Sequence, residues 1–230
     1  RMQCTNNLKQ IGLALHNYHD THRKFPQGNY FDLANVNSQW AWSAMILPFI
    51  EQGNLFNGLN VGPSTLEAAA NDPVKLVLLQ TPLPAFICPS DAEAGVNRNR
   101  PFLAKSTGGL CNGMILPATV QFAKSNYPGC NGNRGNDDGI FSSGGDSNKI
   151  GDITDGTSNT IMVGERPSNR YAKQTVATGP WAAVWAGQEL TCDGITNVWC
   201  LLGKTDFQMN TGKHSLAASN TDAVDSPLLS

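Results

Sequence analysis

The chain is poor in charged residues. Asp, Glu, Lys and Arg make up 15% of its 230 residues, compared with roughly 25% in an average soluble protein. The net charge is -2 and no run of basic residues occurs, so the sequence lacks the charge pattern of a nucleic-acid-binding protein or of a membrane-docking surface. The 23 glycines and 13 prolines predict many turns and few long regular elements.

The sequence also has no long apolar run. The best stretch, residues 40–50, is interrupted by Ser43 and Pro48, and about 20 apolar residues are needed to cross a bilayer. No signal peptide is visible. Because the chain begins at Arg1 in sequence that already looks helical, we expect that an upstream segment precedes it in the natural precursor.

Patterns that carry catalysis are missing as well. There is no CxxC pair of a zinc ribbon and no GxSxG motif of a serine hydrolase. Cys88 would need a histidine base, and His214 is the only histidine downstream of it. Glu165 has no identifiable partner for acid/base work. We therefore predict that the protein is not an enzyme.

Cysteine is present in an even number, six residues. In a chain poor in charge and rich in Asn and Gly, this indicates an oxidised, extracytoplasmic protein. Sequence alone cannot choose among the pairings that six cysteines allow, although the local loops 111–130 and 192–200 are the cheapest to close. The disulfide candidates are Cys4, Cys88, Cys111, Cys130, Cys192 and Cys200.

Three helical stretches are predicted before residue 82. Residues 4–20 form an amphipathic helix that should stop before Phe25–Pro26, because a residue followed by proline avoids the helical region. A second helix covers 42–56, where Pro48 would kink it or stand in a first turn, and a third covers 64–80 with a break at Asp72–Pro73. The apolar stripe of the first helix consists of Leu8, Ile11, Leu15 and Tyr18.

Short apolar runs separated by Gly, Asn and Pro predict strands after residue 82. Strands that follow helices without βαβ alternation predict an α+β fold with an antiparallel sheet. No repeat or linker is visible, so we expect one loop-rich domain over 1–230, with a first helix at 1–22, a helical and loop insertion at 23–81 and a β-rich region at 82–230. The candidate strands are 85–88, 118–123, 139–142, 150–153, 160–165 and 181–187.

Two polar clusters were considered as metal sites. His16, His19 and His22 lie near the end of the first helix, but no fourth ligand is suggested, and polar residues are favoured there by the helix dipole. Among the acidic residues after position 136, Asp152 and Asp155 are the candidate ligands for Ca²⁺, which prefers oxygen. The spacing is not that of an EF-hand loop, and turn-making explains these residues without an ion. We therefore predict no required cofactor.

Five tryptophans support an alternative function. Such rings can line a groove for a glycan or a small solute, although they are more often part of a core. The alternative is therefore an extracellular binding module. The residues that would stack on its ligand are Trp40, Trp42, Trp181 and Trp185.

Four stretches, in this order along the chain, resemble a planctomycete-type family of prepilin-like proteins. They are residues 1–28 (RMQCTNNLKQIGLALHNYHDTHRKFPQG), 40–56 (WAWSAMILPFIEQGNLF), 86–91 (FICPSD) and 151–166 (GDITDGTSNTIMVGER). The resemblance implies a pilin-like fold in which residues 1–22 are the C-terminal half of a long helix packed on an antiparallel sheet. It also implies a hydrophobic helix upstream of Arg1 that anchors the precursor in the membrane.

The resemblance further implies a disulfide between Cys4 and Cys88 and a family turn formed by Asp155, Gly156, Ser158 and Asn159. The chain departs from the family near its end: ten residues separate His214 from Asp225, where the family has nine, and Ser226 replaces a glycine. No role of that closing motif is transferred to this chain.

These observations predict a structural subunit that resembles a type IV pilin or a type II secretion pseudopilin. It would lie at the cell surface or in the periplasm of a bacterium and would self-assemble with other pilin-like subunits through the upstream helix. Without that helix we expect the fragment to be a monomer.

Overall fold

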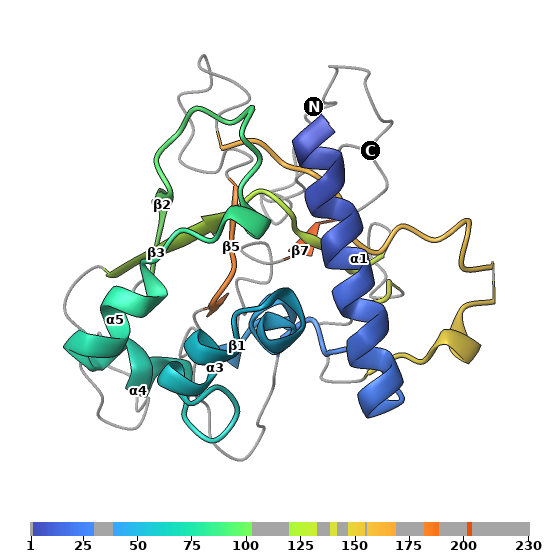
Figure 1. Ribbon diagram of the computed structural model, residues 1–230, viewed down its shortest axis with the longest axis horizontal. Coiled ribbons are helices and arrows are strands. Elements are labelled where there is room, and N and C mark those ends of the chain that lie inside the picture. Colours follow the sequence, from blue (N-terminus) through green and yellow to red (C-terminus); the bar gives the residue numbers. More distant parts are fainter. Residues whose placement is uncertain are drawn as a thin grey trace, which may run out of the picture.

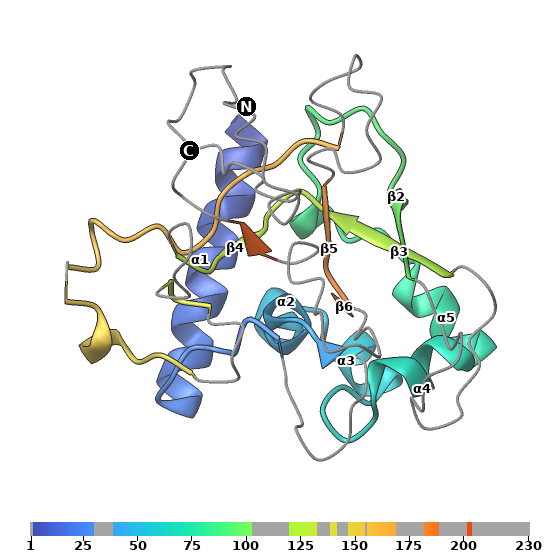
Figure 2. The ribbon, with the colours of Figure 1, turned by 180° about the vertical axis from the view of Figure 1, so that it is seen from behind.

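The computed structural model describes residues 2–29, 39–102, 120–132, 139–141, 147–154, 156–168, 182–188 and 202–203. The long helix α1 (Met2–His22) lies between the short helices of residues 42–79 on one side and the segment around residues 147–165, yellow in Figure 1, on the other. Seen from behind, the strands and the short helices lie together beside it (Figure 2). Among the described helices, none is both long and apolar enough to span a membrane.

Helix α1 buries one stripe along its whole length. The predicted stripe is confirmed for Ile11, Leu15 and Tyr18, while Leu8 is only partly buried. Cys4 and Asn7 extend the buried stripe to the first turns. The helix ends at His22, and Arg23 follows with a left-handed φ of 62°. The predicted stop before Phe25–Pro26 is therefore confirmed.

The predicted second helix is instead three short elements. These are α2 (Trp42–Met45), the 3-10 helix η1 (Leu47–Ile50) and α3 (Gly53–Leu59). Pro48 stands in the first turn of η1, where its missing N–H is harmless, and Glu51 ends η1 with a left-handed φ of 62°. Of the two roles predicted for Pro48, a kink or a place in a first turn, the second is therefore confirmed, while the single helix over 42–56 is wrong.

The predicted third helix breaks at Asp72–Pro73, as expected. Its parts are α4 (Leu66–Asn71) and α5 (Pro73–Leu79). Asp72 caps α5, because its Oδ1 accepts hydrogen bonds from the backbone N–H of Val74 at 2.9 Å and of Lys75 at 3.4 Å. A 3-10 helix, η2 (Pro84–Phe86), follows and leads to Cys88.

The main sheet has three antiparallel strands in the order β2–β3–β5. They are β2 (Val96–Phe102), β3 (Val120–Ser125) and β5 (Ala183–Val184). Two smaller pairs complete the described strands: β1 (Gln39–Trp40) with β6 (Gly187–Gln188), antiparallel, and β4 (Gly129–Cys130) with β7 (Leu202–Gly203), parallel. The mixed helix and strand content confirms the α+β class.

Several predicted strands are wrong. The runs 85–88 and 150–153 contain the 3-10 helices η2 and η3 (Ile150–Asp152). Of the run 160–165, Val163 makes an isolated bridge to Gly129, and residues 139–141 form bends. Short apolar runs are compatible with a strand or with a helical turn. In the run 85–88 the backbone forms a local hydrogen bond of a 3-10 turn, from Phe86 N–H to the Leu83 carbonyl at 2.9 Å. Runs 118–123 and 181–187 overlap β3 and β5–β6.

Candidate functional site

Cys4 and Cys88 form a disulfide across 84 residues of sequence. It joins the first turn of α1 to the segment after η2, and both cysteines are buried. This is the pairing that the family resemblance implied. Cys130 is buried on β4. Cys111, Cys192 and Cys200 lie outside the described residues, so the pairings that involve them stay predictions.

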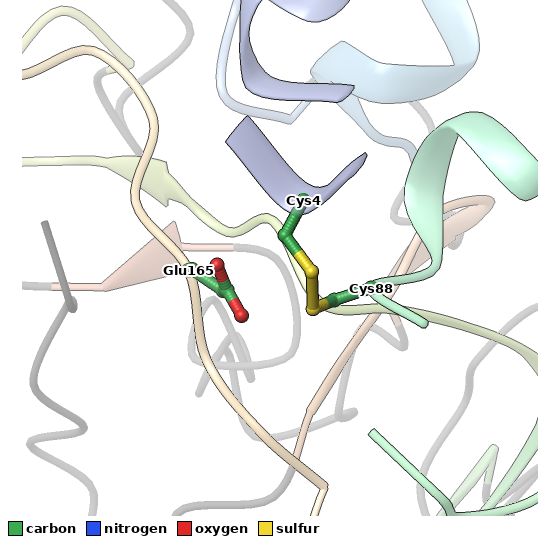
Figure 3. Close-up of side chains that lie close together, drawn as sticks. All are labelled: Cys4, Cys88 and Glu165. Atoms are coloured by element: carbon green, nitrogen blue, oxygen red, sulfur yellow. A yellow bond between two sulfur atoms is a disulfide. The ribbon is translucent and has the colours of Figure 1, made fainter. Parts of the chain in front are cut away.

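The carboxylate of Glu165 lies beside this disulfide (Figure 3). One oxygen of Glu165 and the sulfurs of Cys4 and Cys88 all lie within 4.8 Å of one another. Burial raises the pKa of Glu165 above its usual value, and the negative charge of Asp91 raises it further. Within the described part of the chain, these three residues are the group of His, Cys, Asp and Glu side chains with ligand atoms close enough for one metal ion.

Two side chains fasten α1 near the disulfide. The amide of Asn7 donates hydrogen bonds to the carbonyls of Pro84 at 3.0 Å and Ile87 at 2.9 Å. The hydroxyl of Tyr127 donates to the carbonyl of Cys4 at 3.3 Å. Burial raises the pKa of Tyr127 to about 12, so the phenol stays neutral and remains a donor at ordinary pH. The helix is thus held covalently and by polar bonds over its first two turns.

Asn126, directly after β3, joins two distant segments. Its backbone N–H donates to the Phe86 carbonyl at 2.8 Å, and its own carbonyl accepts from the N–H of Arg166 at 2.7 Å. Its side-chain oxygen accepts from the N–H of Cys88 at 3.0 Å, and its side-chain amide donates to the Arg166 carbonyl at 3.0 Å. One buried side chain therefore ties segments 86–91 and 164–168 to the end of the central strand.

Next to Asn126 lies a buried ion pair. Lys124 Nζ is 3.2 Å from Asp91 Oδ2, and the two side chains are 1% and 7% exposed. The same carboxylate oxygen accepts from Ser168 Oγ at 2.5 Å, from Ser168 N–H at 3.0 Å and from the Asn126 amide at 2.5 Å. Lys124 also donates to the Glu93 carbonyl at 2.8 Å. We call Asp91, Lys124, Asn126 and Ser168 the polar centre.

The polar centre holds a paired negative and positive charge in the interior. Burial alone would raise the pKa of Asp91, but hydrogen bonds from Ser168, Asn126 and Lys124, together with the charge of Lys124, outweigh burial and lower this pKa. Ser168 donates its proton to a carboxylate, and Lys124 is paired as a cation. A serine nucleophile needs a neutral base as its neighbour, which this arrangement does not supply.

Sequence analysis did not predict this centre. Lys124 is the last residue but one of β3, VQFAKS, and Asp91 and Ser168 are separated from it along the chain. The one available signal was a charged residue at a buried-strand position, since burying a lysine requires a partner.

The tryptophans proposed for stacking are core residues where the structure describes them. Trp40, Trp42 and Trp185 are at most 3% exposed. The Trp40 indole N–H donates to the Ser64 carbonyl at 2.6 Å, and Trp42 stacks on Phe141 with ring centroids 4.8 Å apart. Buried rings cannot stack on a surface ligand, so these three are withdrawn from the predicted groove. Trp181 lies outside the described residues.

The proposed family turn is a turn where it is described. Gly156 has a φ of 89°, and its carbonyl accepts from the N–H of Asn159 at 3.0 Å and from the hydroxyl of Thr160 at 3.1 Å. Ser158 is exposed. The exposed Asp152 accepts from the N–H of Lys149 at 2.8 Å, at the start of η3. Asp155 lies outside the described residues, so the predicted Ca²⁺ site is not tested.

The three histidines of α1 do not converge on one point. His19 Nε2 accepts from the N–H of Ile150 at 3.4 Å. The ring of His22 stacks on Tyr18 at 4.0 Å, and His16 is exposed. The rings of His16 and His19 both contact the ring of Phe25, and these aromatic contacts agree with the interpretation that the histidines are polar residues at a helix end.

Comparison with known proteins identifies a family. The family model described as protein of unknown function (DUF1559), SBP_bac_10, matches residues 1–227. No curated protein and no solved structure matches the chain. Because the match covers nearly the whole sequence, the chain belongs to the DUF1559 family.

Proposed function

We propose that this DUF1559 chain is the folded exterior of a pilin-like or pseudopilin-like subunit, a non-enzymatic protein of the bacterial cell surface or periplasm. The observation that supports it best is the attachment of α1. The first turn of this helix is linked covalently through Cys4 to Cys88, while Met2 at its N-terminal end is 90% exposed. In both ribbon views the N-terminal end of α1 lies at the periphery of the molecule (Figures 1 and 2).

Such a helix suits a subunit that is held by its N-terminus. A helical extension upstream of Met2 would leave the domain along the axis of α1, because the buried stripe already starts at Cys4. A force or a packing contact on that extension would reach the domain through the disulfide, Asn7 and Tyr127. Among the described elements α1 packs chiefly against η1 and η2, so the part of the fold that fits the prepilin resemblance is the presence of an antiparallel sheet, not a helix packed on it.

The disulfide supports the proposed location. Disulfides persist in oxidising compartments such as the bacterial periplasm and the cell surface. The polar centre supports a non-enzymatic role, since each of its polar groups is committed to a hydrogen bond or an ion pair. No observation favours the glycan- or solute-binding alternative, because three of its four candidate tryptophans are buried.

The test uses the natural precursor in its own cells. Immunogold labelling with an antibody against the purified chain, together with fractionation of sheared cells, should place the protein in filaments or in the envelope. Deleting the segment upstream of Arg1 should release it as a soluble monomer. The proposal is wrong if the precursor has no apolar helix upstream of Arg1, or if the deletion leaves the location of the protein unchanged.

A further inference from the structure

The disulfide has a neighbour that a structural cross-link does not need. The Glu165 carboxylate is half-buried against two buried sulfurs, with all three ligand atoms within 4.8 Å of one another (Figure 3). The three residues come from α1, from the segment after η2 and from the segment 156–168. They therefore converge through the fold and not through closeness in sequence.

We propose that Cys4, Cys88 and Glu165 bind a thiophilic divalent cation such as Zn²⁺ when the disulfide is reduced. Two thiolates and one carboxylate are ligands that zinc takes in proteins, with distances of about 2.3 Å to sulfur and about 2.0–2.2 Å to oxygen. In the disulfide the two sulfurs are bonded to each other, so in the reduced chain the two cysteine side chains must rotate apart before one cation can lie between both sulfurs and the nearby Glu165 oxygen. A water molecule would complete the tetrahedron.

The chemistry links the site to the redox state. In the reduced chain each thiol loses its proton as the cation binds. An oxidant of the disulfide class then removes two electrons from the two thiolates: the protein's sulfur–sulfur bond forms, the oxidant's sulfur–sulfur bond breaks to give two thiolates that take up protons from water, and the cation leaves to solvent. Oxidation therefore replaces a metal link by a covalent link between the same two segments, and α1 stays attached in both states.

The experiment uses the full chain, reduced by a phosphine and titrated with Co²⁺ and then Zn²⁺. The reduced protein should take one Co²⁺ with the absorbance of a thiolate–cobalt bond, and Zn²⁺ should displace it. Zinc should raise the melting temperature of the reduced protein, because an ion that binds only the folded chain stabilises it. The oxidised protein should show neither effect.

Variants separate this site from the other cysteines. Glu165→Gln removes the carboxylate and should weaken binding at least about tenfold, since even partners outside the ligand shell change metal affinity by 10–100-fold. The matched control is Glu93→Gln, the same change at an exposed acid, which should bind as the unchanged chain does. The double variant Cys4→Ser/Cys88→Ser should lose the cobalt absorbance.

Two results would overturn the inference. One is an equal affinity in Glu165→Gln and Glu93→Gln, which would remove the carboxylate from the site. The other is an unchanged cobalt spectrum in the double cysteine variant, which would assign the metal to the remaining cysteines. If the double variant does not fold, the metal affinities of Glu165→Gln and Glu93→Gln still test whether the Glu165 carboxylate binds the cation. Neither result bears on assembly, which the cell experiment tests separately.

Discussion

Two neighbouring regions of this protein are stabilised by opposite means. The helical segment, residues 42–79, is held by buried apolar side chains such as Leu47, Leu59 and Leu66, and it even leaves Val74 and Val77 exposed. The polar centre holds a lysine and an aspartate that are 1% and 7% exposed. In an apolar core, the loss of stability grows with the size of the side chain that is removed. In a buried ion pair, removing either partner leaves an uncompensated buried charge, which is strongly destabilising.

The most damaging single change is expected in the polar centre. Asp91→Asn keeps the shape of the side chain but leaves Lys124 as a buried cation without its counter-ion. Breaking a buried pair in this way should lower the free energy of unfolding by about 3–5 kcal/mol. Urea denaturation followed by circular dichroism measures the loss.

Two further variants sharpen this result. Glu93→Gln, a similar change at an exposed side chain, should stay within about 0.5 kcal/mol of the unchanged chain. Adding Lys124→Met to Asp91→Asn should restore part of the loss, because it removes the unpaired charge. A loss below about 1 kcal/mol in Asp91→Asn would mean that Lys124 finds another partner or water.

Removing the disulfide should have the next largest effect. Cys4→Ser/Cys88→Ser opens a link across 84 residues and should cost about 2–4 kcal/mol, mainly because the unfolded chain gains freedom. In limited proteolysis, the double variant should be cut first near α1. Equal protection of α1 in the double variant and in the unchanged chain would contradict the idea that the disulfide holds this helix in place.

Acid should break the ion pair without a mutation. The pKa of Asp91 is below its usual value of 3.8 in the folded protein. A carboxyl whose pKa is lowered by folding stabilises the protein above its unfolded pKa, and this contribution is lost as the pH falls through the folded pKa. The stability difference between the unchanged chain and Asp91→Asn should therefore be constant near neutral pH and shrink below about pH 3.8. If the stability difference between the two proteins stays constant down to pH 2, the destabilisation in Asp91→Asn does not come from the loss of the negative charge.

The two regions also differ in how well the sequence predicted them. In the helical segment the signals are local: Asp72–Pro73 marks a helix start wherever the rest of the chain lies. The polar centre depends on three segments that meet only in the fold, and no local pattern encodes the distance from Lys124 to Asp91. The disulfide was predicted through the family resemblance. The loop-closure argument favoured the local pairs 111–130 and 192–200 and left Cys4 and Cys88 only as the remainder.

Strands show the same limit. The strand β2 was missed because its sequence, VNRNRPF, is polar and carries a proline, and it exists through pairing with β3. The runs that became 3-10 helices have apolar side chains suited to a strand, but within the described part of the chain neither run pairs with a strand. Whether a run becomes a strand depends on a partner, which a local pattern does not show.

The smallest expected effect lies in the helical segment, at the cap of α5. Asp72→Ala removes the carboxylate that accepts from Val74 N–H and Lys75 N–H and should lower the free energy of unfolding by about 1 kcal/mol. Asp72→Asn keeps an accepting oxygen and should recover most of it. Because the cap is exposed to water, which can replace the lost acceptor, its removal should be several-fold milder than Asp91→Asn. Equal losses of unfolding free energy in Asp72→Ala and Asp91→Asn would mean that the burial of a carboxylate does not determine how much it stabilises this protein.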